Sequence, residues 1–141
     1  MQREENTAQN QSQSEKDFSY RRALITARAA IDKKAENVKV LDLKGLSGFT
    51  DYFVICSGTS SRQVQAIANS AECAMEAQGQ GTIATEGYRE GRWIVLDFGN
   101  IVVHVFLDAL RDYYDLEKLW ATAHRVKIPP EFYGSAASPL N

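Results

Sequence analysis

A carboxylate and a histidine in this chain are spaced so that they could form an acid–base pair. Asp97 and His104 lie on either side of a predicted two-residue turn, so their side chains are expected to be diagonal neighbours on one face of a β-hairpin. A carboxylate that orients an imidazole base is the arrangement used in nucleophilic catalysis. The candidate nucleophiles by residue type are Cys56, Ser57, Thr59, Ser60 and Ser61. None of them lies in a Gly-x-Ser-x-Gly elbow, so a catalytic triad is not the favoured interpretation.

A second candidate site is the short turn Ser57-Gly58-Thr59-Ser60-Ser61, which lies between a predicted strand and a helix N-terminus. Backbone N–H groups in such a turn can cradle a phosphate, and the turn resembles the Gly-Ser turn of nucleotidyltransferases. Those enzymes also need a carboxylate pair on the following strand to hold Mg²⁺. The corresponding stretch, residues 82–86, reads TIATE and holds no Asp-x-Asp. A helix cap at Ser60 is favoured, and a nucleotide site at Gly58–Ser61 is kept as the alternative function.

Metal binding is not supported by the spacing of the available ligands. The possible ligands are Cys56, Cys73, His104 and His124. No two of them lie within four residues of each other, as structural zinc motifs usually require. We therefore predict no metal and no cofactor. Neither cysteine belongs to a CxxC pair, so both are expected to be reduced core residues.

The composition is that of an ordinary globular domain. The chain has 141 residues, of which 44% are hydrophobic, with 16 basic against 18 acidic residues. This balance lacks the basic excess of a nucleic-acid binder, so little or no direct nucleic-acid binding is expected. No apolar run approaches the roughly 20 residues of a membrane span, and no signal-peptide pattern opens the chain. The predicted location is the cytoplasm, with no membrane partner.

The chain divides into one predicted domain and two tails. Residues 1–17 are rich in Gln, Glu, Asn and Ser and predict a disordered polar tail. Residues 127–141 contain prolines and small residues without periodicity, so a second loose tail is expected, although Phe132 and Tyr133 could dock on the domain. The domain itself spans 18–126.

Helices alternate with about five strands in this domain. We predict a helix over 19–35, another after Ser60, and two short ones starting near Asp108 and Asp115. The Ser60 helix should end near Gly79 or Gly81 and bury one side, consisting of Val64, Ile67, Ala68, Ala71 and Met75. The predicted strands are 38–43, 52–56, 82–85, 93–98 and 101–106. The fold class is α/β, with a mixed, roughly five-stranded sheet packed with helices.

The hairpin formed by the last two strands fixes which side chains share a face. A two-residue turn at Gly99-Asn100 pairs Asp97 with Val102, Val95 with His104, and Trp93 with Phe106. The apolar face, which should pack on the helices, consists of Ile94, Leu96, Phe98, Ile101, Val103 and Val105. The other face combines Trp93, Asp97, His104 and Phe106, a mixture typical of interface cores. The alternative is that another part of the chain covers this face.

Two blocks of sequence carry a resemblance to a known family. The first block is Asp51-Tyr-Phe-Val-Ile-Cys-Ser-Gly-Thr-Ser-Ser-Arg-Gln-Val64. The second comprises Glu86-Gly87-Tyr88, Trp93 to Gly99, Val102 to Phe106, Arg111, Tyr114 to Glu117, and Leu119-Trp120. Together they resemble the ribosomal silencing factor (RsfS, Iojap-like) family over residues 20–121.

The resemblance implies a nucleotidyltransferase-like fold that lacks the catalytic carboxylates and has no enzymatic activity. Such a factor is expected to bind the large ribosomal subunit through the subunit-interface protein numbered fourteen. It would then block joining of the small subunit and repress translation, particularly when nutrients are short. A homodimer of the free protein is a further partner that the sequence leaves open.

The residues expected to contact the partner are Trp93, Asp97, His104 and Phe106, followed by Glu86, Tyr88, Arg111, Tyr114 and Trp120. Core packing is the favoured role for Tyr114 and Trp120, because both are spaced as in a helix among leucines. Arg111 has the alternative of pairing with Asp115, four residues on. Glu86 has the alternative of forming a simple turn with Gly87.

Overall fold

The computed structural model describes residues 18–134, and six strands within them form one mixed sheet. The strands are β1 (Glu36–Asp42), β2 (Tyr52–Gly58), β3 (Ala84–Glu86), β4 (Trp93–Asp97), β5 (Ile101–Leu107) and β6 (His124–Val126). Their order in the sheet is β3-β4-β5-β2-β1-β6. β2 and β5 are parallel and all other neighbours are antiparallel. The predicted mixed α/β fold is confirmed, with one strand more than expected.

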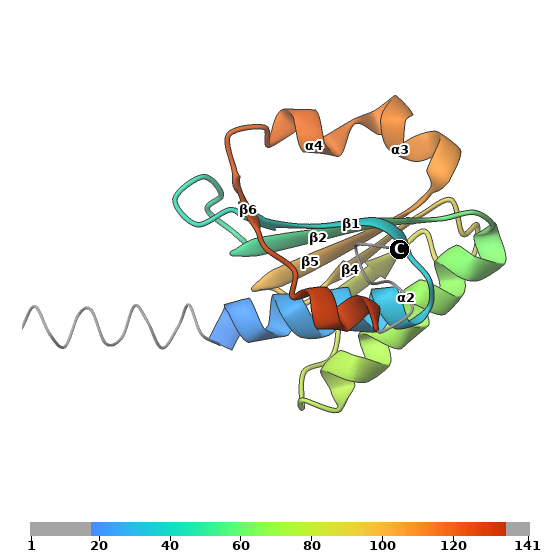
Figure 1. The fold of residues 1–141 in the computed structure, drawn as a ribbon, viewed down its shortest axis with the longest axis horizontal. Coiled ribbons are helices and arrows are strands. Elements are labelled where there is room, and N and C mark those ends of the chain that lie inside the picture. Colours follow the sequence, from blue (N-terminus) through green and yellow to red (C-terminus); the bar gives the residue numbers. More distant parts are fainter. Residues whose placement is uncertain (1–17, 135–141) are drawn as a thin grey trace, which may run out of the picture.

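Helices cover both faces of this sheet (Figure 1). One face carries the first helix, which includes residues 18–32, together with α2 (Ser61–Glu76) and the 3-10 helix η1 (Pro130–Tyr133). The other face carries two short helices, α3 (Asp108–Tyr114) and α4 (Leu116–Leu119). None of the helices in residues 18–134 is long and apolar enough to cross a membrane.

The larger core lies between the sheet and the two long helices, the first helix and α2. The buried side of α2 consists of Val64, Ile67, Ala68, Ala71 and Met75, as predicted. The predicted cap is also confirmed, because the Ser60 Oγ accepts a hydrogen bond from the Gln63 N–H at 3.1 Å. The helix ends at Glu76, earlier than expected. Cys56 belongs to this core, whereas Cys73 is exposed on the outer side of α2, so the prediction that both cysteines are buried was wrong for Cys73.

A smaller core lies under α3 and α4. Its buried members are Leu41, Leu43, Phe53, Ile55, Val102, Phe106 and Ala123. Trp93, Val95, Leu116 and Trp120 are half-buried against it. The two short helices therefore close the second face of the sheet, and they also determine which residues of that face reach the surface.

Part of the segment expected to be a loose C-terminal tail lies against the domain. Phe132 in η1 packs against the larger core, and the Arg28 guanidinium lies 5.4 Å from the centre of its ring. Figure 1 shows η1 beside the first helix. The tail predicted at residues 1–17 and the last part of the tail predicted at 127–141, residues 135–141, lie outside the described residues.

Candidate interaction surface

The β4–β5 hairpin has the predicted register. Trp93 pairs with Phe106, Val95 with His104, and Asp97 with Val102. The apolar face of the hairpin lies in the larger core, where its six predicted members are buried. The mixed face points toward α3 and α4. The sequence therefore identified correctly which side chains share each face of the hairpin.

Two residues of the mixed face are buried by the short helices. Phe106 has no exposed surface and only 6% of His104 is exposed. The alternative that the chain covers its own sheet thus holds for both, and we correct their expected role from partner contact to packing. Trp93 and Asp97 are only half-buried, so they remain available at the edge of the face.

His104 is held in an aromatic environment. Its Nδ1 accepts a hydrogen bond from the Trp93 Nε1–H at 3.2 Å, and its ring lies edge-on to Phe53 with centroids 4.6 Å apart. The Nε2 atom is buried and has no hydrogen-bond partner among the described residues. Burial lowers the pKa of the His104 imidazole from 6.5 to about 4. His104 is therefore neutral at physiological pH.

The suggested catalytic pair does not form. Asp97 Oδ1 accepts a hydrogen bond from the Gly99 N–H at 2.8 Å, while His104 is bonded to Trp93. Asp97 therefore closes the hairpin turn and does not orient the imidazole. Of the candidate nucleophiles, Cys56 is fully buried and burial raises its thiol pKa to about 12, which keeps it protonated at neutral pH. The structure therefore contains neither the Asp97–His104 pair of the suggested catalytic triad nor a reactive thiolate at Cys56.

The turn considered for phosphate binding engages several of its donors within the chain. The Thr59 N–H and Oγ1 both donate to the Gln63 Oε1, at 2.7 and 3.0 Å. The Gln63 N–H donates to Ser60 Oγ, and the Val64 N–H donates to the Ser60 carbonyl. The N–H groups of Thr59 and Gln63 are therefore already engaged within the chain, which removes two of the donors that a phosphate in this turn could use. Within residues 18–134, no group of three or more His, Cys, Asp or Glu side chains is arranged to hold a metal ion.

An aromatic patch, which we define as Trp93, Tyr113 and Tyr114, reaches the surface where α3 meets the hairpin. The Tyr114 ring lies 4.7 Å from the Trp93 ring, and Tyr113 lies edge-on to Tyr114 at 5.1 Å. Tyr114 is 49% exposed and Tyr113 is 79% exposed. Tyr114 is thus more exposed than its favoured core role implied. Sequence reasoning missed Tyr113. It lies on a helix too short to show a periodic pattern, so its position shortly after the hairpin was the one signal that could have identified it.

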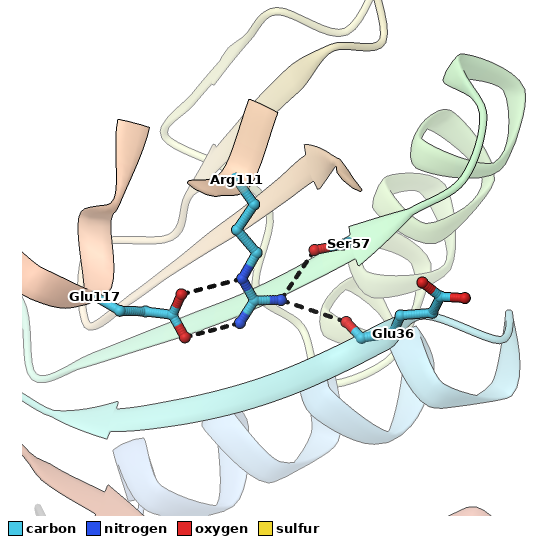
Figure 2. Close-up of polar contacts among 4 residues, drawn as sticks. All are labelled: Glu36, Ser57, Arg111 and Glu117. Carbon is cyan, nitrogen blue, oxygen red and sulfur yellow. Dashed lines mark hydrogen bonds and ion pairs between the residues drawn. The ribbon is translucent and has the colours of Figure 1, made fainter. Parts of the chain in front are cut away.

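Arg111 is buried at the base of this patch. Its Nε and Nη2 donate to the two carboxylate oxygens of Glu117, at 3.1 and 2.9 Å, and Nη1 donates to Ser57 Oγ at 2.9 Å (Figure 2). The suggested pairing with Asp115 was wrong, since Glu117 is the partner. The hydrogen bond and the positive charge of Arg111 lower the Glu117 pKa, against the opposing effect of partial burial. Only 6% of Arg111 is exposed, so its side chain offers little surface for contact with a partner.

The other expected contact residues lie in different settings. Trp120 is half-buried and lies edge-on to Phe53 at 5.9 Å, in the packing role favoured from the sequence. Glu86 is exposed at the end of the edge strand β3, and Gly87 follows it in a turn with φ of +78°. Tyr88 is 40% exposed, and its hydroxyl accepts a hydrogen bond from Asn69 of α2. Glu86 and Tyr88 therefore reach solvent outside the aromatic patch.

Comparison with known proteins identifies the family. The family described as "Ribosomal silencing factor during starvation" matches residues 11–139 of the chain. The chain belongs to the RsfS family. The residues matched by the RsfS family include β4, which carries Trp93, and α3, which carries Tyr113 and Tyr114.

Individual relatives support this assignment over most of their length. The ribosomal silencing factor RsfS of Bacillus subtilis is 46% identical over 99 residues, which cover 70% of this chain and 84% of that protein. That of Halalkalibacterium halodurans is 45% identical over 104 residues, covering 74% and 89%. A crystal structure of a protein from Chromobacterium violaceum superposes with a TM-score of 0.71 at 34% identity, covering 86% of this chain and 98% of that one. The resemblance noted from the sequence is confirmed.

Proposed function

We propose that this RsfS-family chain binds the large ribosomal subunit through the subunit-interface protein numbered fourteen and sterically prevents the small subunit from joining. A steric mechanism requires a complementary surface and no reactive group. The relatives are named as silencing factors, which suggests a regulator without enzymatic activity. Repression of translation would follow directly from occupied large subunits, in the compartment that holds the ribosomes, here the cytoplasm.

The observation that carries this proposal is the aromatic patch. The Trp93 and Tyr114 rings are in tilted contact at the surface, and Tyr113 extends beyond them. Tyrosine and tryptophan are enriched among the residues that dominate binding energy at protein interfaces, because they bury a large area with little loss of side-chain freedom. Asp97, Glu86 and Tyr88 are the remaining solvent-accessible candidates, and we propose them as flanking contacts.

Co-sedimentation with separated ribosomal subunits tests this proposal. The purified chain should migrate with large subunits and should reduce the yield of joined ribosomes when small subunits are added. Tyr114→Ala should weaken binding at least about tenfold, as expected for the loss of a central aromatic contact. Tyr133→Ala is the matched control, because Tyr133 is similarly exposed at 41% but lies in η1 on the opposite face of the sheet.

Each outcome has a clear meaning. Equal loss of binding in both tyrosine variants would exclude the patch as the specific contact. No migration of the native chain with either subunit would overturn the proposed function.

The same patch is available to a second copy of the chain when no ribosome is present, so the oligomeric state of the free protein should be measured in parallel. A homodimer lost in Tyr114→Ala would indicate that self-association and ribosome binding compete for one surface.

A further inference from the structure

α3, which carries both exposed tyrosines, and the following helix α4 are too short to hold their positions by themselves. α3 has 7 residues and α4 has 4, and helices this short are unstable in isolation. They are separated by one residue, Asp115, whose φ of 46° and ψ of 51° lie in the left-handed region. That region is disfavoured for residues with a Cβ. The orientation of Tyr114, which immediately precedes Asp115, must therefore be set by tertiary contacts.

Arg111 and Glu117 provide such contacts from either side of this break. The two parallel hydrogen bonds between the guanidinium and the carboxylate join α3 to α4. The third guanidinium nitrogen reaches the sheet, where it donates to Ser57 Oγ in β2 at 2.9 Å and to the Glu36 carbonyl at the start of β1 at 3.4 Å. Figure 2 shows the guanidinium lying between the carboxylate of Glu117 and these two strands. Four hydrogen bonds from one side chain thus connect four elements.

The geometry of the pair favours a positioning role. An Arg–carboxylate pair joined by two parallel hydrogen bonds is strong, and the two groups are held in a fixed relative orientation. The Arg111 carbonyl also accepts the hydrogen bond from the Asp115 N–H at 2.9 Å, so the same residue fixes the backbone on which Tyr114 lies. Among the described aromatic rings of the hairpin, that of Trp93 is nearest to the Tyr114 ring, with centroids 4.7 Å apart. The Phe106 ring is farther away, at 6.4 Å. Movement of α3 would therefore separate the two rings.

We propose that Arg111 and Glu117 form a clamp that positions Tyr114 against Trp93, and that this clamp determines how tightly the aromatic patch binds its ribosomal partner. The second part rests on the proposed function, whereas the first concerns the free protein alone. The clamp residues are positioning residues. Arg111 is buried, and the Glu117 side chain is 24% exposed, so neither needs to contact the partner.

The decisive variant replaces both charges at once. Removing one partner would leave a buried charge unpaired and unfold the region, whereas replacing a buried ion pair by apolar side chains of similar size is often tolerated. In the double variant Arg111→Met/Glu117→Met, we expect the fold to be retained but the clamp to be lost. Nuclear Overhauser effects between the Trp93 and Tyr114 rings, measured by NMR on the free protein, should weaken or disappear. Affinity for isolated large subunits should fall at least about tenfold.

Two further variants keep the test informative. Lys118→Met removes an exposed charge from α4 and should leave the ring contacts unchanged, which controls for the loss of a charge as such. Arg111→Lys keeps a cation beside Glu117 but cannot make two parallel bonds, so it should weaken the same ring contacts even if the double variant does not fold. Folded clamp variants with native ring contacts and native affinity would overturn the proposal. If the native chain does not bind large subunits, the proposed function fails, while the ring contacts still decide whether the clamp positions Tyr114.

Discussion

His104 illustrates how the same residue type can indicate chemistry in a sequence and packing in a structure. The alternation of the hairpin placed it correctly beside Trp93 and on the face shared with Phe106. Alternation alone, however, does not reveal whether a face is open or covered. The answer depends on α3 and α4, which together span only 11 residues and leave little periodic signal. The sequence could thus predict which side chains of the hairpin share a face, but it could not predict that His104 is buried.

The lowered pKa of His104 predicts a loss of stability in mild acid. Its pKa is about 4 in the folded chain and near 6.5 when unfolded. Below pH 6.5 the unfolded chain therefore binds a proton that the folded chain excludes, so the free energy of unfolding decreases as pH falls from about 6.5 to about 4. Between pH 7 and pH 5 the contribution of this one group should be roughly 2 kcal/mol. Urea denaturation at the two pH values measures it.

His104→Gln provides the control for this pH dependence, because glutamine can accept the Trp93 hydrogen bond but does not titrate. The variant should lose about 2 kcal/mol less than the native chain between pH 7 and pH 5. The lowered Glu117 pKa acts in a different range: its stabilisation is present above its unfolded pKa near 4.5 and is lost only as pH falls below that value. An equal pH dependence in native and variant chains would show that His104 is not the responsible group.

At the scale of elements, the strongly patterned ones were predictable and the short ones were not. The α2 helix was recognisable from its cap and apolar side, and the hairpin from its two-residue turn. The β6 strand was missed because it has only three residues, of which His124 and Arg125 are exposed and charged or polar. It is a strand because β1 offers it an edge, with Leu41 opposite Arg125. Such tertiary pairing is invisible in local sequence.

The turn between β3 and β4 gives a test at this scale. Gly87 has a φ of +78°, and a Cβ at this position would collide with the Trp93 carbonyl oxygen. Gly45 has a nearly identical φ of +80°, but a Cβ there would meet nothing within 4 Å. Gly45→Ala should therefore cost only the left-handed strain, about 1 kcal/mol, whereas Gly87→Ala should cost about 3 kcal/mol because β4 must also shift. Thermal or urea denaturation compares them, and equal losses would show that the close approach to Trp93 is unimportant.

At the scale of the whole molecule, the two faces of the sheet differ in what they offer to a partner. The first helix, α2 and η1 close one face over the larger core. The opposite face is closed by short helices that leave the aromatic patch exposed. Around that patch, α3, α4 and the residue between them present Asp108, Asp112 and Asp115 as exposed carboxylates, against Lys118 as the exposed cation. The α3–α4 side of the patch therefore carries net negative charge, which favours a partner surface with exposed basic residues on that side.

This asymmetry predicts how association should respond to salt and to single charges. Because charges at the border of an interface act mainly on the association rate, raising the ionic strength should slow binding to large subunits and leave dissociation nearly unchanged. Asp112→Asn should slow association about threefold at low salt. Asp32→Asn, which removes an exposed carboxylate from the first helix on the opposite face, should have little effect even though it changes the net charge equally. Surface plasmon resonance on immobilised large subunits separates the two rates. Equal slowing by both substitutions would mean that only the net charge of the chain matters, and that the acidic border does not orient the aromatic patch toward its partner.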